Sequence, residues 1–278
     1  MSTSPDALSQ LLPKVKQLAQ NAGEAILEIY QQDDLGVSVK SDDSPLTLAD
    51  LAAHRCIVAG LTQLTPEWPI LSEESAEIDW AARQQWQTYW LVDPLDGTKE
   101  FVKRNGEFTV NIALIHQGQS ILGVVYAPVL NRFYYAAQGV GAFEHNIGQT
   151  EKTLLLTPNV EPAIWRLVGS RSHAADRVAA FSEGFAQSEL VPMGSSLKIC
   201  LVAANQADLY PRFGPTSEWD TAAAQAVVEC AGGLVLDDQL QPLRYNQKSS
   251  LLNPEFVVCQ HIDSQWAERF SQLATHQS

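Results

Sequence analysis

Residues 90–101, WLVDPLDGTKEF, decide the fold, because an apolar strand runs straight into a turn that carries two acids. The strand end 90–92 is apolar throughout, and Asp93 and Asp96 follow it at once. Two acids beside a buried strand end repel each other and lose hydration. We therefore expect a bound cation at this turn, although Asp, Pro and Gly also favour turns for steric reasons alone.

Two amphipathic helices are predicted before this turn. Apolar side chains recur at three- and four-residue spacing over 6–31, despite Pro13, and again over 46–64. Short strands at 68–71 and 88–92 follow, and each ends directly in acidic residues. Both acidic clusters are therefore expected at strand ends.

Beyond the turn the pattern changes once, near 144–162. Before that stretch, β-branched and aromatic segments separated by turns predict an antiparallel meander; after it, strands and helices alternate as in an α/β arrangement. The expected elements are strands 108–115, 121–127, 132–136, 164–168, 207–210 and 234–236, and helices 174–186, 196–205 and 221–230. We divide the chain into an N-terminal α+β half, 1–155, with metal-binding loops, and a C-terminal α/β half, 156–278, with substrate-binding elements. A site between the halves is expected.

Composition describes an ordinary globular protein of 278 residues, 45% of them hydrophobic. Asp and Glu number 32 against 18 Lys and Arg, and the formal charge of −14 opposes nonspecific binding to nucleic acid. No apolar run approaches the roughly 20 residues of a membrane helix, and the N-terminus lacks a leader pattern. We expect a cytoplasmic protein without an integral membrane segment, with peripheral association at the inner membrane left open. The 4 cysteines form no CxxC pair, so free buried thiols are expected.

Acidic residues gather at the ends of the predicted elements. They are Asp50, Glu73, Glu74, Asp93, Asp96 and Asp220. Oxygen ligands without clustered His or Cys suit a hard cation, and Mg²⁺ takes a few carboxylates while keeping waters. The Leu95 carbonyl can add a neutral oxygen within a tight turn, and two ions about 4 Å apart could bridge one phosphate ester. These residues indicate phosphate ester hydrolysis, although Asp220 also suits a helix cap.

Longer motifs resemble those of a known family. VDPLDGTKEF, SEES, KSDDSPLTLAD and WDTAAA are similar to signatures of the inositol monophosphatase superfamily. GEFTVNIALI, GVVYAPV, SRSH, GSSLK and LYPRFGP resemble the CysQ-type 3′(2′),5′-bisphosphate nucleotidases, in the same order over nearly the whole chain. Departures fall in 75–87, in about 144–161 and in the tail. The resemblance implies a layered αβαβα sandwich of the inositol monophosphatase/fructose-1,6-bisphosphatase (sugar phosphatase) type.

The resemblance also implies a catalytic site that uses Mg²⁺, as two or three ions. The implied metal ligands are Glu73, Asp93, the Leu95 carbonyl, Asp96 and Asp220. The implied catalytic residues are Asp50, Thr98 and Glu73; Asp50 and Thr98 orient and deprotonate the attacking water, because the Thr98 hydroxyl can both donate and accept. Lithium inhibits much of the superfamily by occupying one cation position, so a lithium-sensitive protein is expected.

Substrate contacts are expected at Gly97, Thr98, His173, Gly194, Ser195, Ser196, Lys198, Arg212 and Asp220. Residues 194–198 stand at an expected helix N-terminus, where free amides attract a phosphate and Lys198 adds a charge. The same residues suit an ordinary capped helix. By resemblance His173 lies near the nucleotide and Arg212 contacts a second phosphate, although a lone Arg is most simply a solvated surface charge.

The expected reaction is Mg²⁺-dependent removal of the 3′-phosphate of adenosine 3′,5′-bisphosphate (PAP), giving AMP and phosphate. Action on 3′-phosphoadenylyl sulfate (PAPS) to give adenylyl sulfate is a further option, and both belong to sulfur metabolism. A phosphatase for inositol monophosphate or a sugar bisphosphate would keep the metal residues but use other groups around 194–198. A regulator that binds metal or nucleotide without turnover is the alternative from another class. The implied partner is a small nucleotide bisphosphate, bound by a monomer or homodimer.

Overall fold

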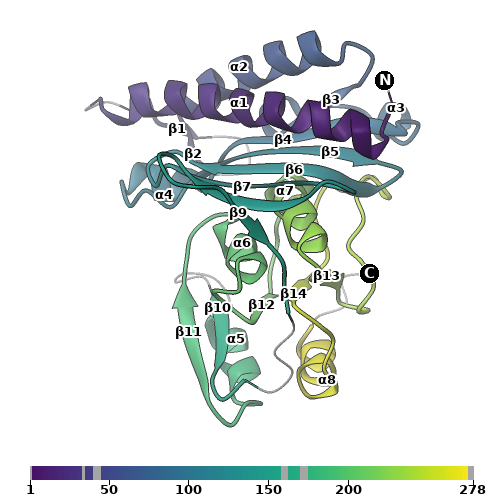
Figure 1. The fold of residues 1–278 in the computed structure, drawn as a ribbon. Helices are drawn as coiled ribbons and strands as arrows, with labels where there is room; N and C mark the ends of the chain where they lie inside the picture. Colours follow the sequence, from purple (N-terminus) through teal and green to yellow (C-terminus); the bar gives the residue numbers. More distant parts are fainter. Residues whose placement is uncertain (1, 33–34, 40–44, 158–161, 170–174, 275–278) are drawn as a thin grey trace.

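Helices and sheets alternate in the order αβαβα (Figure 1). The computed structural model describes residues 2–32, 35–39, 45–157, 162–169 and 175–274. Helices α1 (Pro5–Tyr30) and α2 (Leu48–Leu64) cover one face of a seven-stranded sheet. Helices α6 (Leu197–Ala203) and α7 (Glu218–Cys230) lie between it and a five-stranded sheet, whose outer face carries α5 (Ala175–Ser182) and α8 (Ser264–Leu273). The expected layered sandwich is confirmed.

The outer helix pair follows its sequence pattern closely. The hydroxyl of Ser4 accepts the backbone N–H of Ala7 (3.4 Å) and caps α1, which continues through Pro13. Helix α2 begins at Leu48, later than the predicted start at 46, because β2 (Pro45–Leu46) pairs antiparallel with β1 (Ser38–Val39). Proline lacks the N–H and is compatible with such a strand end.

The seven-stranded sheet confirms the predicted meander. Its strands, in spatial order, are β3 (Ile70–Ser72), β4 (Thr88–Asp96), β5 (Thr109–His116), β6 (Gln119–Ala127), β7 (Arg132–Ala137), β8 (Gly141–Asn146) and β9 (Lys152–Leu154). Strands β4 to β9 pair antiparallel in chain order. Strand β9, at the edge of the sheet, and the second half of β8 fall in the stretch interpreted as variable, because both strands bury few residues and carry no apolar run.

The parallel pairing of β3 with β4 brings the two acidic segments together. Ser72 pairs with Val92, so Glu73 and Asp93 follow the last paired residues at the same edge of the sheet. Parallel strands end side by side, whereas antiparallel neighbours would place these ends apart. The pairing direction therefore decides where the acids meet.

Alternating side chains of β4 contribute to two different cores. Trp90 and Val92 pack with α1 and α2, whereas Tyr89 and Leu91 belong to the core that includes α6 and α7. This is the two-residue period of a strand that is buried on both faces. The nine-residue strand is consequently held from both sides up to its acidic end.

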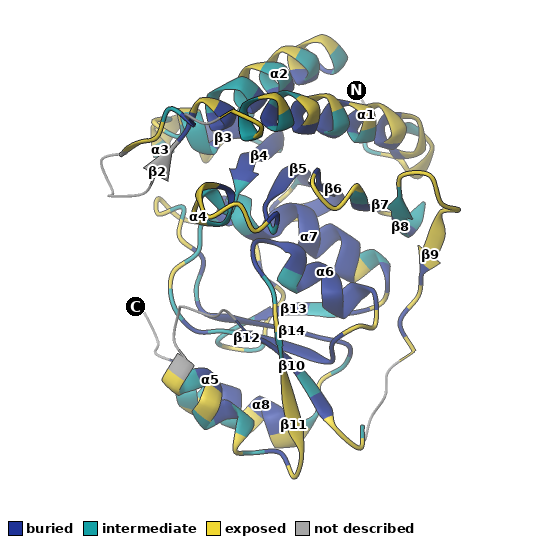
Figure 2. Ribbon diagram, turned by 90° about the vertical axis from the view of Figure 1, so that its left-hand side faces the viewer, coloured by how far each residue is buried: buried dark blue, intermediate teal, exposed yellow. Residues whose placement is uncertain are grey.

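Helix α7 is part of the middle helix layer, and its residues are mostly buried (Figure 2). The Ser120 hydroxyl on β6 donates to the carbonyl of Ala222 (2.7 Å) and docks the helix on the sheet. Helix α7 begins at Glu218, earlier than the predicted start at 221, because Ser217 and Asp220 form a capping box around its first turn. The short α6 lies within the predicted helix 196–205.

The five-stranded sheet is mixed, not simply parallel, and has the order β11-β10-β12-β14-β13. Its strands are β10 (Trp165–Gly169), β11 (Ser188–Pro192), β12 (Leu209–Arg212), β13 (Leu234–Asp237) and β14 (Phe256–Cys259). Strands β11 and β14 and helix α8 were not predicted, and the predicted helix 174–186 ends early, at Ser182. The buried run of β14 did carry a strand signal, since its four residues are all apolar.

Two other expectations concern cysteines and domains. All four cysteines are free; Cys200 and Cys259 are buried, whereas Cys56 and Cys230 are half-buried. In the described part of the chain, no helix has both the length and the apolar character needed to cross a membrane.

One buried core contains residues from both sides of position 155, including Leu91 and Val258. The division of the chain at 155 stays a prediction.

Candidate active site

The end of β4 aims two acids into one space. Asp93 and Asp96 are three positions apart, so a regular strand would point them to opposite faces. The pairing of β4 with β5 shifts register between these two residues, and the Asp93 carboxylate accepts the N–H of Leu95 (3.0 Å). Gly97 follows with φ +92°, a backbone conformation that favours glycine, and α4 (Thr98–Val102) then begins. The irregular turn therefore replaces strand alternation with a shared direction.

A third acid reaches this turn from the middle helix layer. Oxygen atoms of Asp93, Asp96 and Asp220 all lie within 4.8 Å of one another. Asp220 stands in the first turn of α7 and also accepts the backbone N–H of Ser217 (2.8 Å). One carboxylate oxygen of Asp220 therefore caps the helix, while its carboxylate also lies among the other acids; the role of Asp220 as a metal ligand stays a prediction.

The two glutamates after β3 take different places. The carboxyl of Glu73, on the short helix η1 (Glu73–Ser75), lies against Asp93 and raises the pKa of Asp93. Glu74 lies near His54: burial lowers the pKa of this histidine, and the glutamate opposes that shift. Glu73 therefore borders the acid cluster.

Burial and mutual repulsion act together on these acids. Burial raises the pKa of Asp93, which is 1% exposed, well above its usual range, and Glu73, Asp96 and Asp220 raise it further. Burial, followed by Asp96, raises the pKa of Asp220 to about 8. Burial likewise raises the pKa of Asp96, although Lys198 and the N–H of Ser196 oppose it. Clustered oxygen ligands that repel one another and lack His or Cys fit a hard divalent cation such as Mg²⁺.

Asp96 has a set of polar neighbours that sequence reasoning missed. Its carboxylate accepts the backbone N–H of Ser196, and the side chains of Thr109 and Asn111 on β5 lie 3.5 Å from the same oxygen. The Ser196 hydroxyl donates to Asn111 Oδ1 and contacts the Thr109 hydroxyl, both at 2.8 Å. The only signal in the sequence was the presence of two polar residues, Thr109 and Asn111, in the mostly apolar predicted strand 108–115. Pairing of β4 with β5 places Asn111 beside Asp93 and Thr109 beside Asp96.

Asp50 and Thr98, for which the resemblance implies catalytic roles that stay predictions, lie in contact. The Thr98 hydroxyl lies 3.3 Å from Asp50 Oδ1 and 3.3 Å from the Leu95 carbonyl oxygen. The other carboxylate oxygen of Asp50 accepts the N–H (2.8 Å) and hydroxyl of Thr47, which fixes its orientation at the start of α2. Thr47 is a further residue that sequence reasoning did not assign to the site. The pair is thus a hydroxyl held by a buried, oriented carboxylate.

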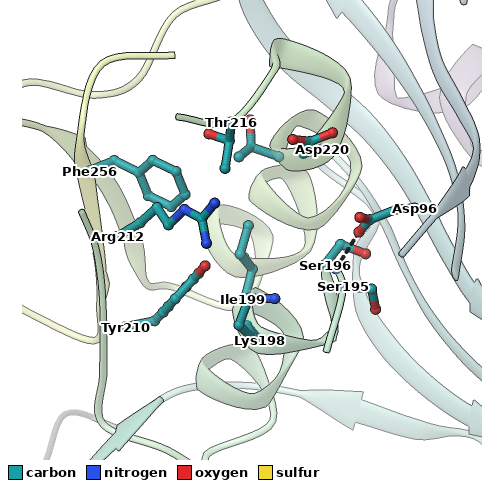
Figure 3. Close-up of a pocket in the computed structure, with 11 residues that line it drawn as sticks. Asp96, Ser195, Ser196, Lys198, Ile199, Tyr210, Arg212, Thr216, Asp220 and Phe256 are labelled. Atoms are coloured by element: carbon teal, nitrogen blue, oxygen red, sulfur yellow. Dashed lines mark hydrogen bonds between the residues drawn. The ribbon is translucent and has the colours of Figure 1, made fainter. Parts of the chain in front are cut away.

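A pocket opens beside the acids and contains the expected cationic residues (Figure 3). It is lined by Asp96, Ser195, Ser196, Lys198, Ile199, Tyr210, Arg212, Thr216, Asp220, Thr221 and Phe256. Figure 3 shows Arg212, Tyr210 and Phe256 across the pocket from Asp96 and Asp220. Arg212 is therefore a wall of the pocket and not a remote surface charge. Tyr210 and Phe256, whose rings lie 5.8 Å apart, were not expected here.

The segment 194–198 differs in detail from the predicted phosphate cradle. Its helix α6 has only seven residues, and the N–H of Ser196 is bound to Asp96, so this amide is not a free donor for a phosphate. Ser195 adopts φ +48°, and Lys198 lines the pocket. His173 lies outside the described residues. The contacts of these residues with a substrate stay predictions.

Gly194 is predicted to be required because the backbone passes so close to its neighbours. A Cβ at this position would lie 2.8 Å from the Glu107 carbonyl oxygen and 2.9 Å from Glu107 Cβ. We expect Gly194→Ala to displace the turn that supplies the Ser196 N–H, to lower stability by about 1–3 kcal/mol, as overpacking does, and to raise the KM for substrate. Thermal unfolding and steady-state kinetics measure both effects.

Gly148→Ala is the control for this change. Gly148 has φ +87° but no atom within 4 Å of an added Cβ, so alanine there strains the backbone without touching the pocket. The control should lose stability and keep its KM. An unchanged KM in a folded Gly194→Ala protein would remove Gly194 from the site.

Several known proteins are similar to this chain over most of its length. The sequence model of the inositol monophosphatase family matches residues 7–275. A Salmonella typhimurium protein named 3′(2′),5′-bisphosphate nucleotidase CysQ is 51% identical over 249 residues, which cover 89% of this chain and 99% of the relative. The protein of the same name from Aggregatibacter actinomycetemcomitans is 40% identical, over 96% of this chain and 98% of its own.

Solved structures show the same architecture. The crystal structure of CysQ from Bacteroides thetaiotaomicron, described as a bacterial member of the inositol monophosphatase family, matches with a TM-score of 0.76 and 42% identity, covering 88% of this chain and 95% of that one. The suhB protein of Bartonella henselae matches with a TM-score of 0.75 and 25% identity, over 96% and 99% of the two chains. The likeness thus extends over nearly the full length of each protein.

Proposed function

Because this chain belongs to the inositol monophosphatase family, we propose that it is a Mg²⁺-dependent 3′(2′),5′-bisphosphate nucleotidase that converts adenosine 3′,5′-bisphosphate to AMP and phosphate. The observation that carries this proposal is the convergence of Asp93, Asp96 and Asp220 within 4.8 Å beside a pocket that also contains Lys198 and Arg212. An acid cluster suits cations, and nearby basic side chains suit a further phosphate on the same substrate. The names of the relatives support the nucleotide as that substrate.

In this proposal the acids hold the metal. Glu73, Asp93, the Leu95 carbonyl, Asp96 and Asp220 would bind two or three Mg²⁺ ions. Bound Mg²⁺ supplies positive charge for the phosphate oxygens and makes nearby water more acidic. The N–H of Ser196 and the side chains of Thr109 and Asn111 hold Asp96 in the ligating orientation. Groups that hydrogen-bond to a metal ligand in this way commonly orient it and tune the affinity for the metal.

The proton of the attacking water would leave through Thr98 and Asp50. The Thr98 hydroxyl would take that proton while passing its own proton to Asp50 Oδ1, which suits a group that both donates and accepts. The water oxygen would bond to phosphorus as the bond between phosphorus and the 3′-oxygen breaks, and the leaving oxygen would take up a proton from solvent. Free phosphate and AMP result.

The pocket chemistry favours a bisphosphate nucleotide over a simple monophosphate. Lys198 and Arg212 offer positive charge in the same pocket as Asp96 and Asp220, and Tyr210 and Phe256 offer aromatic surface for a base. PAPS presents the same 3′-phosphate, so its conversion to adenylyl sulfate is part of the proposal. We place the protein in the cytoplasm, where it would act in sulfur metabolism, and expect lithium to inhibit it.

Phosphate release from a substrate panel tests the proposal. The purified protein is incubated with adenosine 3′,5′-bisphosphate, PAPS, inositol monophosphate and fructose 1,6-bisphosphate, with and without Mg²⁺. We expect the highest kcat/KM on adenosine 3′,5′-bisphosphate and none without the ion. A preference for inositol monophosphate or the sugar bisphosphate would contradict the nucleotide assignment. Nucleotide binding without any phosphate release would identify a regulator instead.

Arg212→Met is expected to separate bisphosphate from monophosphate substrates. A hydrogen bond to a charged group is worth about 1.5–3 kcal/mol, so losing the contact with the second phosphate should raise the KM for adenosine 3′,5′-bisphosphate roughly 10- to 150-fold. The KM for adenosine 3′-monophosphate, which has no second phosphate, should change little. Lys103→Met, at an exposed lysine, is the control. Equal KM changes for the two substrates would place Arg212 elsewhere in the mechanism.

A further inference from the structure

Arg83 is an unusual residue because a charged side chain is almost fully buried, at 2% exposed. It lies at the end of the short helix α3 (Trp80–Arg83), before β4. Its guanidinium donates to Asn246 Oδ1 (2.7 Å), to the Lys248 carbonyl (3.2 Å) and to the Ser249 carbonyl. It also packs over the ring of Trp80, 4.7 Å from the ring centre. One side chain of the N-terminal half therefore holds a loop of the C-terminal half.

That loop holds the first turn of α7. The backbone N–H of Asn246 donates to both carboxylate oxygens of Glu218, at 3.0 and 2.9 Å. Farther along the loop, the Leu251 carbonyl accepts the N–H of Glu218 (2.8 Å). The Asn253 amide donates to the carbonyl of Ser217 (2.8 Å). The loop thus binds two successive residues at the start of α7, Ser217 and Glu218.

Asp220 stands in this same turn and must be held against repulsion. Its carboxylate lies within 4.8 Å of those of Asp93 and Asp96, and like charges at this distance favour separation of the elements that carry them. Asp93 and Asp96 belong to β4, whereas Asp220 belongs to α7. A rigid link between the segment before β4 and the start of α7 therefore reduces the freedom of Asp220 to move away.

We propose that Arg83 is a positioning residue for the metal site, acting through Asn246 and Glu218 to keep Asp220 beside Asp93 and Asp96. The proposal rests on the Mg²⁺-dependent function proposed above. Arg83 touches neither ion nor substrate; it preorganises one ligand. Its loss consequently weakens Mg²⁺ binding more than it slows turnover once the ions are bound. Loss of outer groups that orient a ligand typically costs about 10- to 100-fold in metal affinity.

The test compares Mg²⁺ affinity and turnover in two variants that cut the link at different points. Arg83→Met removes the donors and keeps much of the side-chain volume. Asn246→Ala removes both side-chain contacts with Arg83, the acceptor of its guanidinium and the amide that donates to its carbonyl (2.6 Å), while retaining the backbone N–H that binds Glu218. The Kd for Mg²⁺ is measured by calorimetry and by the rise in melting temperature on adding Mg²⁺. We expect a Kd roughly 10- to 100-fold higher in both variants, with kcat at saturating Mg²⁺ nearly unchanged.

Arg166→Met is the matched control. Arg166 binds Asp208 (2.7 Å) and the Asn205 carbonyl (2.9 Å), so its loss also removes a set of arginine contacts. These contacts join β10 to the segment between α6 and β12 and do not involve α7. It should lower the melting temperature and leave the Kd for Mg²⁺ unchanged. Because Arg83 and Asn246 belong to one series of hydrogen bonds, the double variant should lose little more Mg²⁺ affinity than either single variant.

The outcomes separate this inference from the proposed function. A folded Arg83→Met protein with the unaltered Kd for Mg²⁺ overturns the positioning role, as does an equal rise of Kd in Arg166→Met. If Arg83→Met does not fold, the Kd of Asn246→Ala decides in the same way. Mg²⁺ binding by the unaltered protein without release of phosphate from adenosine 3′,5′-bisphosphate would overturn the proposed function alone. Absence of Mg²⁺ binding would overturn both.

Discussion

Asp96→Asn should abolish turnover while leaving the metal-free protein at least as stable as the unaltered one. The change removes one of three carboxylates that converge within 4.8 Å, so the site loses ligand charge. The loss of activity should exceed the roughly 100-fold upper range for groups that only orient a ligand. Burial already disfavours the charged form of Asp96, and the neutral amide still offers an oxygen to the Ser196 N–H. Removal of a like charge from the cluster therefore leaves the metal-free protein at least as stable as the unaltered one.

Two measurements separate these effects. Phosphate release across a range of Mg²⁺ concentrations reports activity, and thermal unfolding with and without Mg²⁺ reports stability. The unaltered protein should melt at a higher temperature when Mg²⁺ is added, since a ligand stabilises the state that binds it. Asp96→Asn should lose most of this rise. Asp6→Asn, at an exposed acid in the first turn of α1, is the control and should keep both properties. Normal turnover of Asp96→Asn at saturating Mg²⁺ would exclude Asp96 as a ligand.

Thr98→Val should lower kcat by about 10²- to 10⁴-fold, the usual contribution of a positioned proton-transfer group. Valine keeps the shape of threonine but removes the hydroxyl that lies 3.3 Å from both Asp50 Oδ1 and the Leu95 carbonyl. The carboxylates of the acid cluster are untouched, so the Kd for Mg²⁺ should change far less than kcat. This combination is the reverse of the one expected for Arg83→Met.

Thr98→Ser is the matched variant because it keeps the hydroxyl and removes only a methyl group. It should recover most of the lost kcat. Single-turnover kinetics at saturating Mg²⁺ and substrate isolate the chemical step from product release. A Thr98→Val protein with nearly normal kcat would show that the water loses its proton by another route.

The local features of this protein were predictable from its sequence. Hydrophobic periodicity and turn residues identified most of the helices and strands that carry the site, including β4 and α2. Such elements are predictable because their formation depends on neighbours a few positions away in the sequence. The acids after β3 and at the end of β4 were recognisable in the sequence because acidic residues follow directly on apolar ones. Elements with weak local signals, such as the exposed strand β11, were missed.

Resemblance extended the prediction to distant residues, but not to their contacts. Arg212 stood as a lone basic residue in the sequence, and only the tertiary structure, which brings the end of β12 into one pocket with Asp220 of α7, makes it a wall of that pocket. The Ser196 N–H was expected to be free for a phosphate, yet it binds Asp96. Arg83 lay within a stretch that departed from the family pattern, and its role at the Asn246 loop emerged from the structure.

The sequence by itself determined which oxygen-bearing side chains are present, where strands end and which class of ion they suit. Only the tertiary structure decided that Asp220 meets Asp93 and Asp96, that β5 supplies Thr109 and Asn111 to Asp96, and that Arg83 reaches across the two halves. The physical reason is that such contacts join segments far apart along the chain. They leave no period in the local pattern and arise from the direction in which strands pair and the way the layers pack.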